Sequence, residues 1–216
     1  MQWTVLIPVR SLVGAKTRLV DASAGHMEHQ SLVLAIRTDT IAAALTAHGV
    51  ARVVRVLDRD EPGEAGEPAP DQAGTISFVQ RTPGLNAALR EAAEYAAMTW
   101  PRDAVAALVG DLPALRPADL ADALARAAAM PTAFVPDADG TGTTLLTACP
   151  PHRLQPEFGL GSAARHAAQA VALTAAPGLR RDVDTDADLA QAARLGFGPA
   201  TAAARGRAAN VTGCSS

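Results

Sequence analysis

The sequence has few aromatic residues, few cysteines and no long apolar run. Aromatic side chains make up 3% of the 216 residues and hydrophobic ones 49%, so Ala, Leu and Val must fill the core. A chain of this length can bury roughly 70% of its unfolded surface in one domain. The apolar run at Thr4–Ile7 is too short for a signal peptide or a membrane span.

The cysteine content and the net charge limit the compartments and partners that we expect for this protein. Cys149 and Cys214 have no CxxC or Cys/His ligand spacing. We expect both to be reduced thiols in a cytoplasmic protein, because disulfides belong to oxidising compartments. The formal net charge of -3 offers no basic field for nucleic acid. We therefore expect neither a nucleic acid nor a membrane as partner.

Short β-branched runs alternate with longer Ala/Leu segments along the chain. We predict strands at residues 4–7, 53–57, 76–79, 104–109 and 132–135, and helices at 28–48, 85–99, 117–129, 162–170 and 186–195. This alternation predicts an α/β fold with three layers, α/β/α, around a mostly parallel sheet. We expect one domain over residues 1–200 and a disordered tail over 201–216, which lacks apolar periodicity.

One carboxylate is expected at the end of a central strand. Asp111 follows the apolar run 104–109 through Gly110. Ligands of open α/β sheets bind beyond the carboxyl ends of the strands. Hard cations such as Mg²⁺ prefer oxygen ligands, so Asp111 is a candidate metal ligand. The alternative is that Asp111 only forms a turn.

Two other segments could bind phosphate. Lys16 and Arg18 follow the first strand and could neutralise a triphosphate, although the segment matches neither a Walker loop nor the Gly-x-Gly-x-x-Gly fingerprint. Gly159 to Ser162 opens a predicted helix, whose free amides could bind an anion. Ser162 could equally be only the N-cap of that helix.

Acidic residues recur near the C-terminal end of the predicted domain. Asp182, Asp184, Asp186 and Asp188 alternate, which on an extended segment would place their side chains on one face. One or two of them could be metal ligands, and the others would be solvated or cap a helix, as Asp186 could. Whether Asp182, Asp137 or Asp139 binds metal stays open.

Taken together, the motifs resemble the guanylyltransferases of coenzyme F-420 biosynthesis. The resemblance covers about residues 3–196. The motifs that carry it occur in the same order as in that family: Ile7–Arg10 with Ala15–Leu19, Gly84–Ala88, Gly110–Leu115, Pro136–Thr144, Phe158–His166 and Leu179–Thr185.

The resemblance implies a Rossmann-like nucleotidyltransferase fold and transfer of GMP from GTP to a small phosphorylated acid, with release of pyrophosphate. The Ala-rich, Arg-over-Lys composition looks actinobacterial, which favours phosphoenolpyruvate as the acid and enolpyruvoyl-2-diphospho-5'-guanosine as the product. 2-Phospho-L-lactate and 3-phosphoglycerate are the alternatives. A homodimer and hand-over of a labile product to the next enzyme stay open.

The same resemblance implies roles for single residues. Asp111 and Asp184 match the positions that hold two Mg²⁺ ions, and Lys16, with Arg18 beside it, contacts phosphate. Thr144, Gly159 and Ser162 bind the acid. Gln80, Gly84 and Asn86 match the segment that faces the guanine, although Asn86 could instead cap the helix that follows.

Two departures from the family pattern stand out. Arg10 replaces the usual lysine, and Glu28–His29 replaces a Glu–Arg pair. Sugar-1-phosphate and molybdopterin nucleotidyltransferases are rivals, but they carry a glycine-rich loop after the first strand, where this chain has only Gly14. A nucleotide-binding module without turnover is a further alternative.

Overall fold

The computed structural model describes residues 1–9, 26–58, 74–150 and 152–212. The strands are β1 (Trp3–Val9), β2 (Val50–Leu57), β3 (Thr75–Val79), β4 (Ala104–Leu108), β5 (Thr132–Pro136), β6 (Thr143–Ala148) and β7 (Val171–Ala172). The helices are α1 (His26–Thr46), α2 (Leu85–Thr99), α3 (Pro117–Ala127), α4 (Ser162–Ala167), α5 (Pro177–Arg180), α6 (Asp186–Leu195) and α7 (Pro199–Thr212).

The strands form one mixed sheet in the order β3-β2-β1-β4-β6-β5-β7. The first four are parallel, and β1 pairs with β4 through Leu6 and Ala107. Strand β6 runs antiparallel to both neighbours, whereas β7 is parallel to β5. The five strands predicted from the sequence are all present, in a sheet that is mostly parallel, as expected.

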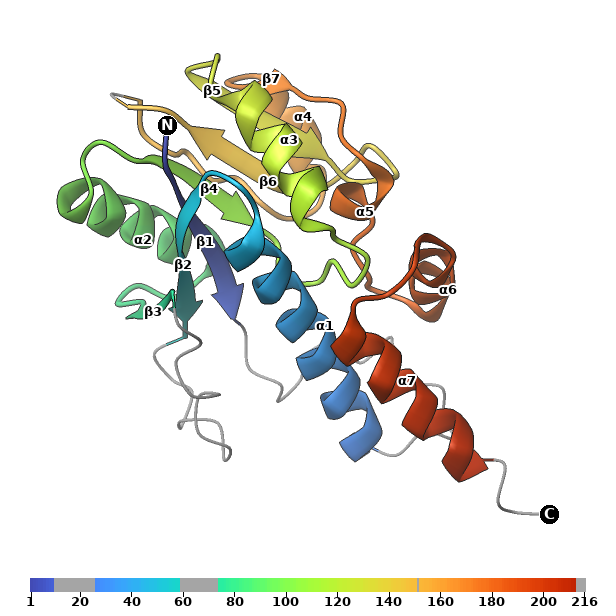
Figure 1. The fold of residues 1–216 in the computed structure, drawn as a ribbon. Coiled ribbons are helices and arrows are strands. Elements are labelled where there is room, and N and C mark those ends of the chain that lie inside the picture. Colours follow the sequence, from blue (N-terminus) through green and yellow to red (C-terminus); the bar gives the residue numbers. More distant parts are fainter. Residues whose placement is uncertain (10–25, 59–73, 151, 213–216) are drawn as a thin grey trace.

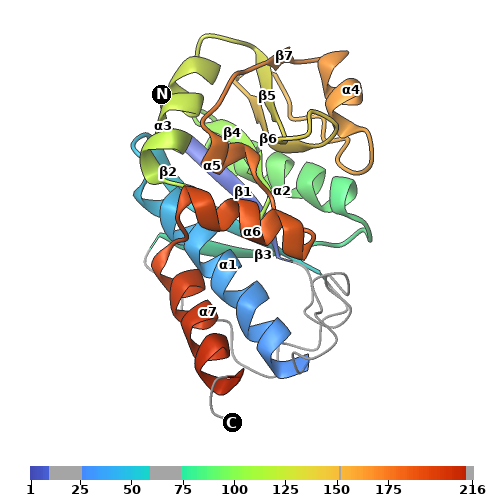
Figure 2. The same ribbon diagram turned by 90° about the vertical axis from the view of Figure 1, so that its right-hand side faces the viewer.

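Helices cover both faces of the sheet, as Figures 1 and 2 show. Helices α1, α3 and α5 pack on one face, where side chains such as Val5, Leu108 and Leu124 are buried. Helices α2 and α4 pack on the other, with Leu89 and Phe134 in the core. Since aromatic residues are scarce, both cores consist mainly of Ala, Leu and Val, and the prediction of three layers is confirmed.

Strand β6 is an element that the sequence analysis missed. Three of its six residues are threonines, and the sequence analysis predicted no strand over residues 143–148. All six residues are buried, because the threonine hydroxyls bond within the fold: that of Thr147 donates to the carbonyl of Ala133 at 3.0 Å. β-Branched residues favour strands, so the threonines support β6 once their hydroxyls are satisfied.

Helix α7 stands where we expected a disordered tail from Thr201, so that prediction was wrong for the residues of the helix. The helix packs along α1 (Figure 1). Its start is fixed by the buried Asp39 of α1, whose carboxylate accepts the amides of Ala200 at 3.0 Å and Thr201 at 2.7 Å. Alanine-rich segments form helices readily. The cap by Asp39 stabilises this helix although its sequence lacks apolar periodicity.

Two further observations concern membrane-spanning helices and cysteines. In the described part of the chain, no helix is both long enough and apolar enough to cross a bilayer. Cys149 is a buried free thiol. Cys214 lies outside the described residues.

We predict that Asp39→Ala destabilises the protein by about 1–2 kcal/mol, because two amides at the start of α7 lose their acceptor. Urea unfolding at constant pH measures this change. Thr38→Ala is the matched control: Thr38 is exposed and bonds only within α1, so its effect should stay below about 0.5 kcal/mol. Equal effects of the two substitutions would contradict the role of Asp39.

Candidate active site

The order in which strands are added to the sheet reverses between β1 and β4. The chain crosses from β1 to β2 on one side, whereas β4 lies on the other side of β1. Such a switch point leaves a crevice at the carboxyl ends of the two strands. Gly110 lies close to β1 there: a Cβ at this position would meet the carbonyl of Pro8 at 3.3 Å. Arg10, Lys16 and Arg18 follow β1 in sequence but lie outside the described residues.

Asp111 lies at this edge of the sheet, just after β4, in a loop whose backbone is held by two hydrogen bonds. The next amide, of Leu112, donates to the hydroxyl of Thr40 in α1 at 3.1 Å. The carbonyl of Asp111 accepts the amide of Val183 at 3.1 Å. The second bond brings the segment before α6, with Asp182 and Asp184, against the end of β4. Two motifs that are distant in sequence therefore meet.

The carboxylates that meet here repel one another. Burial raises the pKa of Asp182 from 3.8 to about 7, and the negative charges of Asp111, Asp137 and Asp184 contribute to the rise. We call these four residues the acidic cluster. Such an excess of negative charge is a property that a bound cation would relieve.

Asp137 has a structural role in the turn between β5 and β6. Its two carboxylate oxygens accept the amides of Thr141 at 2.9 Å and Gly142 at 2.7 Å. Arg180 of α5 donates to the carbonyl of Asp137 at 2.6 Å. Asp139 is 74% exposed and lies 3.6 Å from the guanidinium of Arg181. Both aspartates therefore already have partners in the fold.

The alternating aspartates do not share one extended face, and the expectation that most of them are solvated or cap a helix is confirmed for Asp186 and Asp188. The chain turns into α6 at Asp186, so the period of two ends there. Thr185, not Asp186, is the N-cap, and it forms a reciprocal capping box with Asp188. The signal was available, because Thr185 followed three residues later by an acidic residue resembles a capping box.

The segment of residues 157–162, which we call the glycine loop, leads into α4 and includes its first residue. Gly159 and Gly161 both have positive φ, of 118° and 71°, and Gly161 is the N-cap. Ser162 is buried as the first residue of α4, so the alternative that its side chain is the N-cap was wrong. Leu160 between the glycines is 97% exposed.

The glycine loop is tied to α4 by side chains of α4 itself. His166 is fully buried, and its Nε2 accepts the amide of Glu157 at 3.0 Å while its Nδ1 lies 2.8 Å from the hydroxyl of Thr143. Burial lowers the pKa of His166, so the ring stays neutral with its proton on Nδ1. Arg165 donates to the carbonyls of Glu157 and Leu160.

Thr144 lies next to this network, in β6. It is fully buried, and its carbonyl accepts the amide of Val109 at 3.0 Å. The antiparallel pairing of β6 with β4 places Thr144 at the same edge of the sheet as Asp111. The structure therefore gathers Thr144, the acidic cluster and the end of β4 at one place.

The segment before α2 was expected to face a base. Gln80 is buried and donates through Nε2 to Asp58 at 2.9 Å, whereas Gly84 is exposed, with φ of 104°. Glu91 of α2 fixes the turn between them. It accepts the hydroxyl and amide of Thr82 and the amide of Arg81, and these bonds, that of the Thr82 hydroxyl first, lower the pKa of its carboxyl.

Asn86 has a use that the sequence did not reveal. Its side-chain Oδ1 accepts the amide of Phe158 at 2.8 Å, and its Nδ2 donates to the carbonyl of Phe158 at 3.1 Å. Gly84 is the N-cap of α2, and no side chain caps this helix, so the alternative of a capping role for Asn86 was wrong.

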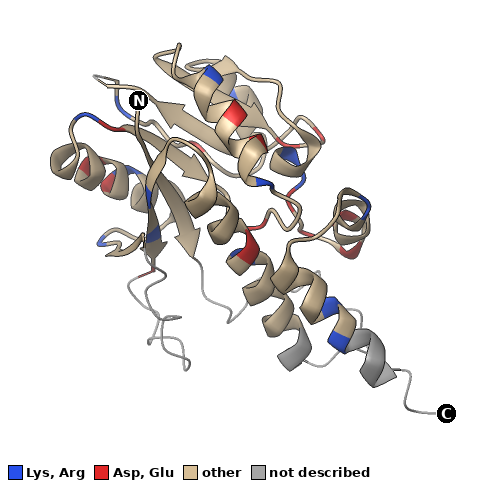
Figure 3. Cartoon of the chain, viewed as in Figure 1, with Lys and Arg blue, Asp and Glu red and all other residues tan. Residues whose placement is uncertain are grey.

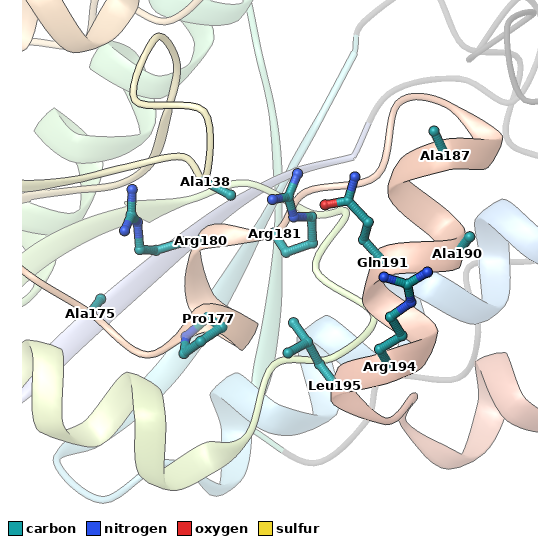
Figure 4. Close-up of a pocket in the computed structure, with 10 residues that line it drawn as sticks. All are labelled: Ala138, Ala175, Pro177, Arg180, Arg181, Ala187, Ala190, Gln191, Arg194 and Leu195. Carbon is teal, nitrogen blue, oxygen red and sulfur yellow. The ribbon is translucent and has the colours of Figure 1, made fainter.

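A cavity of about 590 Å³ is lined mainly by residues of α5 and α6 (Figure 4). Alanines and Pro177 form much of its wall, and Arg181, Gln191 and Arg194 supply polar groups. Arg180 donates hydrogen bonds to the carbonyls of Pro136 and Asp137. The guanidinium of Arg181 lies 3.6 Å from the carboxylates of both Asp139 and Asp188. In the view of Figure 3, basic and acidic residues intermingle around these helices.

Over the described residues, no three His, Cys, Asp or Glu side chains are arranged to hold a metal ion among themselves. Mg²⁺ is usually bound by one or two carboxylates, with water and substrate phosphates completing its ligands. The acidic cluster fits that pattern better than it fits a cage made only of protein ligands. Whether Asp111 and Asp184 are the ligands stays a prediction.

Comparison with known sequences decides the family. A sequence profile described as "Guanylyl transferase CofC like" matches residues 3–190. This chain belongs to that family. A phosphoenolpyruvate guanylyltransferase of Geodermatophilus obscurus is 50% identical, covering 98% of this chain and 97% of its own length. The enzyme of the same name from Streptomyces scabiei is 46% identical, with 96% and 97% covered.

Solved structures support the fold of this CofC-like chain. A putative nucleotide-diphospho-sugar transferase of Desulfovibrio desulfuricans G20 superposes with a TM-score of 0.61 at 18% identity, covering 88% of this chain and 85% of that one. Rv0371c of Mycobacterium tuberculosis, in complex with manganese, gives 0.52 at 19% identity, with 88% and 97% covered. The expectation of a nucleotidyltransferase fold is confirmed.

The raised pKa of Asp182 predicts how stability depends on pH in the metal-free protein. The folded state holds the proton up to about pH 7, whereas the unfolded chain releases it near 3.8. The stabilising effect of protonated Asp182 on the free energy of unfolding is therefore fully present below about pH 4 and is lost as the pH rises to 7. Asp182→Asn should be more stable than the unchanged protein at pH 8 and should lose part of the slope between pH 4 and 7.

Chemical denaturation in the presence of a chelator measures both curves. Asp122→Asn is the control, because the Asp122 carboxylate is exposed and pairs only with Arg126 of its own helix. Parallel curves for the unchanged protein and Asp182→Asn would show that Asp182 carries no such strain.

Proposed function

We propose that this chain transfers GMP from GTP to phosphoenolpyruvate and releases pyrophosphate. The observation that carries the proposal is the near-complete likeness, at 50% and 46% identity, to two relatives named phosphoenolpyruvate guanylyltransferase. The geometry agrees with it, because the glycine loop and the acidic cluster lie at the carboxyl edge of a nucleotidyltransferase sheet.

In this reaction a phosphate oxygen of phosphoenolpyruvate attacks the α-phosphorus of GTP. A new phosphorus–oxygen bond forms as the bond from the α-phosphorus to the β-bridging oxygen breaks, and pyrophosphate leaves with that electron pair. The product is enolpyruvoyl-2-diphospho-5'-guanosine. The attacking phosphate is already ionised at neutral pH, so no general base is needed. The protein contributes chiefly by positioning the two substrates and by stabilising charge.

Asp111 and Asp184 would hold Mg²⁺, with two ions expected. The mutual repulsion within the acidic cluster fits cation binding, and Rv0371c, which shares the fold, was crystallised with manganese. Bound Mg²⁺ would screen the repulsion between the two phosphorylated substrates. Asp137 is the weaker candidate for a ligand, since both its carboxylate oxygens already accept amides.

The glycine loop would bind the acid through Gly159 and Ser162, with Thr144 beside them in β6. Within the described residues, the amides of Gly159, Leu160 and Gly161 donate to no acceptor. Consecutive unbonded amides around glycines of positive φ are a common site for phosphate or carboxylate groups. The loop therefore offers donors where the acid needs them.

GTP would be bound by two segments. Lys16 and Arg18 would neutralise its phosphates. Of the three residues expected to face the guanine, the exposed Gly84 is the best placed, because the side chains of Gln80 and Asn86 already bond within the fold.

We predict Mg²⁺-dependent pyrophosphate release from GTP when phosphoenolpyruvate is supplied, and little release with 2-phospho-L-lactate or 3-phosphoglycerate. A coupled pyrophosphate assay measures all three acids singly, with ATP and CTP as controls for the nucleotide. Faster release with either of the other acids would reassign the acceptor. If no acid gives pyrophosphate release while GTP still binds, the result would favour a nucleotide-binding module without turnover.

We predict that Asp111→Asn and Asp184→Asn each lower kcat by at least about a hundredfold, because charge stabilisation by a metal is worth several kcal/mol. Pyrophosphate release at saturating substrates measures this loss, and circular dichroism checks the fold. Asp122→Asn, which removes an exposed carboxylate of α3, should keep full activity. Near-normal turnover of Asp184→Asn would remove this residue from the metal site.

Two expectations about partners stay predictions. Light scattering after size-exclusion chromatography tests the homodimer. Hand-over of a labile product would show as faster overall turnover when an enzyme that consumes the product is added.

A further inference from the structure

We propose that Asn86 is a positioning residue that fixes the glycine loop against the start of α2, and that it does not read the guanine base. The inference rests on the proposed function, because it assigns the loop to the acid and the segment before α2 to the nucleotide. Under that assignment, Asn86 sets the spacing between the two substrates.

The first observation is the geometry of the Asn86–Phe158 pair. The amide of Phe158 donates to Oδ1 at 2.8 Å, and its carbonyl accepts from Nδ2 at 3.1 Å, across 72 residues of sequence. The side-chain amide thus satisfies both backbone groups of one residue, as a neighbouring strand would. Two bonds of this kind fix both the orientation and the position of Phe158.

The second observation is where this pair lies. Gly159, with φ of 118°, follows Phe158 directly, so the orientation of the Phe158 peptide sets the start of the turn that presents Gly159 and Ser162. At the other end of the contact, Gly84 lies two residues before Asn86 and is the N-cap of α2. A shift of Phe158 relative to Asn86 would therefore move the acid relative to the nucleotide.

The third observation separates Asn86 from the other ties of the loop. Those of Arg165 and His166 to residues 157 and 160 span five to nine residues, so they hold the loop to α4 and would move with it. The His166–Thr143 contact joins that unit to β6. Among the side-chain bonds of the described residues, those of Asn86 join the unit to α2.

Packing around the pair supports the same role. The ring of Phe158 is buried with Ala88 and Leu89 of α2, and its centroid lies 5.1 Å from that of His166 at a steep angle. Apolar packing is non-directional, so it holds the ring in the core without setting the orientation of the Phe158 peptide. The two hydrogen bonds of Asn86 fix the orientation of the Phe158 backbone, which packing alone does not.

The test is a kinetic comparison of Asn86→Ala, Asn86→Asp and Glu94→Gln. In Asn86→Ala we expect kcat/KM for phosphoenolpyruvate to fall by up to about a hundredfold, because small displacements of a reacting group are that costly. KM for GTP and the preference for GTP over ATP should stay unchanged. Asn86→Asp keeps an acceptor for the Phe158 amide but sets an oxygen against its carbonyl, so it should also be impaired. Glu94, exposed on the same helix, is the control.

A base-reading Asn86 predicts the opposite split: KM for GTP rises, discrimination against ATP relaxes, and the acid is bound as before. That result, or no change in any parameter, would overturn the proposal. Hydrogen exchange at the amides of Glu157 and Phe158, measured without substrates, tests the pair independently of turnover. Exchange should be faster in Asn86→Ala and unchanged in Glu94→Gln, and equal rates would refute the positioning role even if the unchanged protein proved inactive.

Discussion

The hydrogen bond from the amide of Val183 to the carbonyl of Asp111 is the contact on which the rest of the site depends. It joins the end of β4 to the segment that leads into α6, and so holds Asp111 close to Asp182 and Asp184. Burial, and after it the negative charges of Asp111, Asp137 and Asp184, raise the pKa of Asp182. Val183 is buried with Ile36 and Leu189, and this apolar packing stabilises the segment that carries Asp182 and Asp184. The excess of negative charge gathered there suits a bound cation.

The other half of the site is assembled from neutral groups. The glycine loop has its backbone bonded by His166, Arg165 and Asn86, which leaves the amides of Gly159 to Gly161 without an acceptor in the described structure. A rigid loop with free donors can bind an anion without reorganising. The acidic cluster and this loop lie at the same edge of the sheet, so one half suits cations and the other suits anions.

The sequence predicted the fold more fully than the site. Five strands and both helical layers followed from apolar periodicity, since buried strands and amphipathic helices leave that signal. Strand β6 was missed because its threonine hydroxyls look polar until their partners are known, and α7 because its cap, Asp39, lies in another helix. Asp111 at a strand end could be predicted. The pairing of Asn86 with Phe158 could not, because no local pattern encodes a bond across 72 residues.

The central claim is that the phosphate of the acid is the nucleophile and that GMP is the transferred group. Phosphoenolpyruvate labelled with ¹⁸O in its phosphate, incubated with GTP and the protein, tests it most directly by mass spectrometry of the products. The account predicts a guanosine diphosphate ester of the acid that carries all the label, beside unlabelled pyrophosphate. Label in pyrophosphate, or a guanosine product without it, would contradict the account.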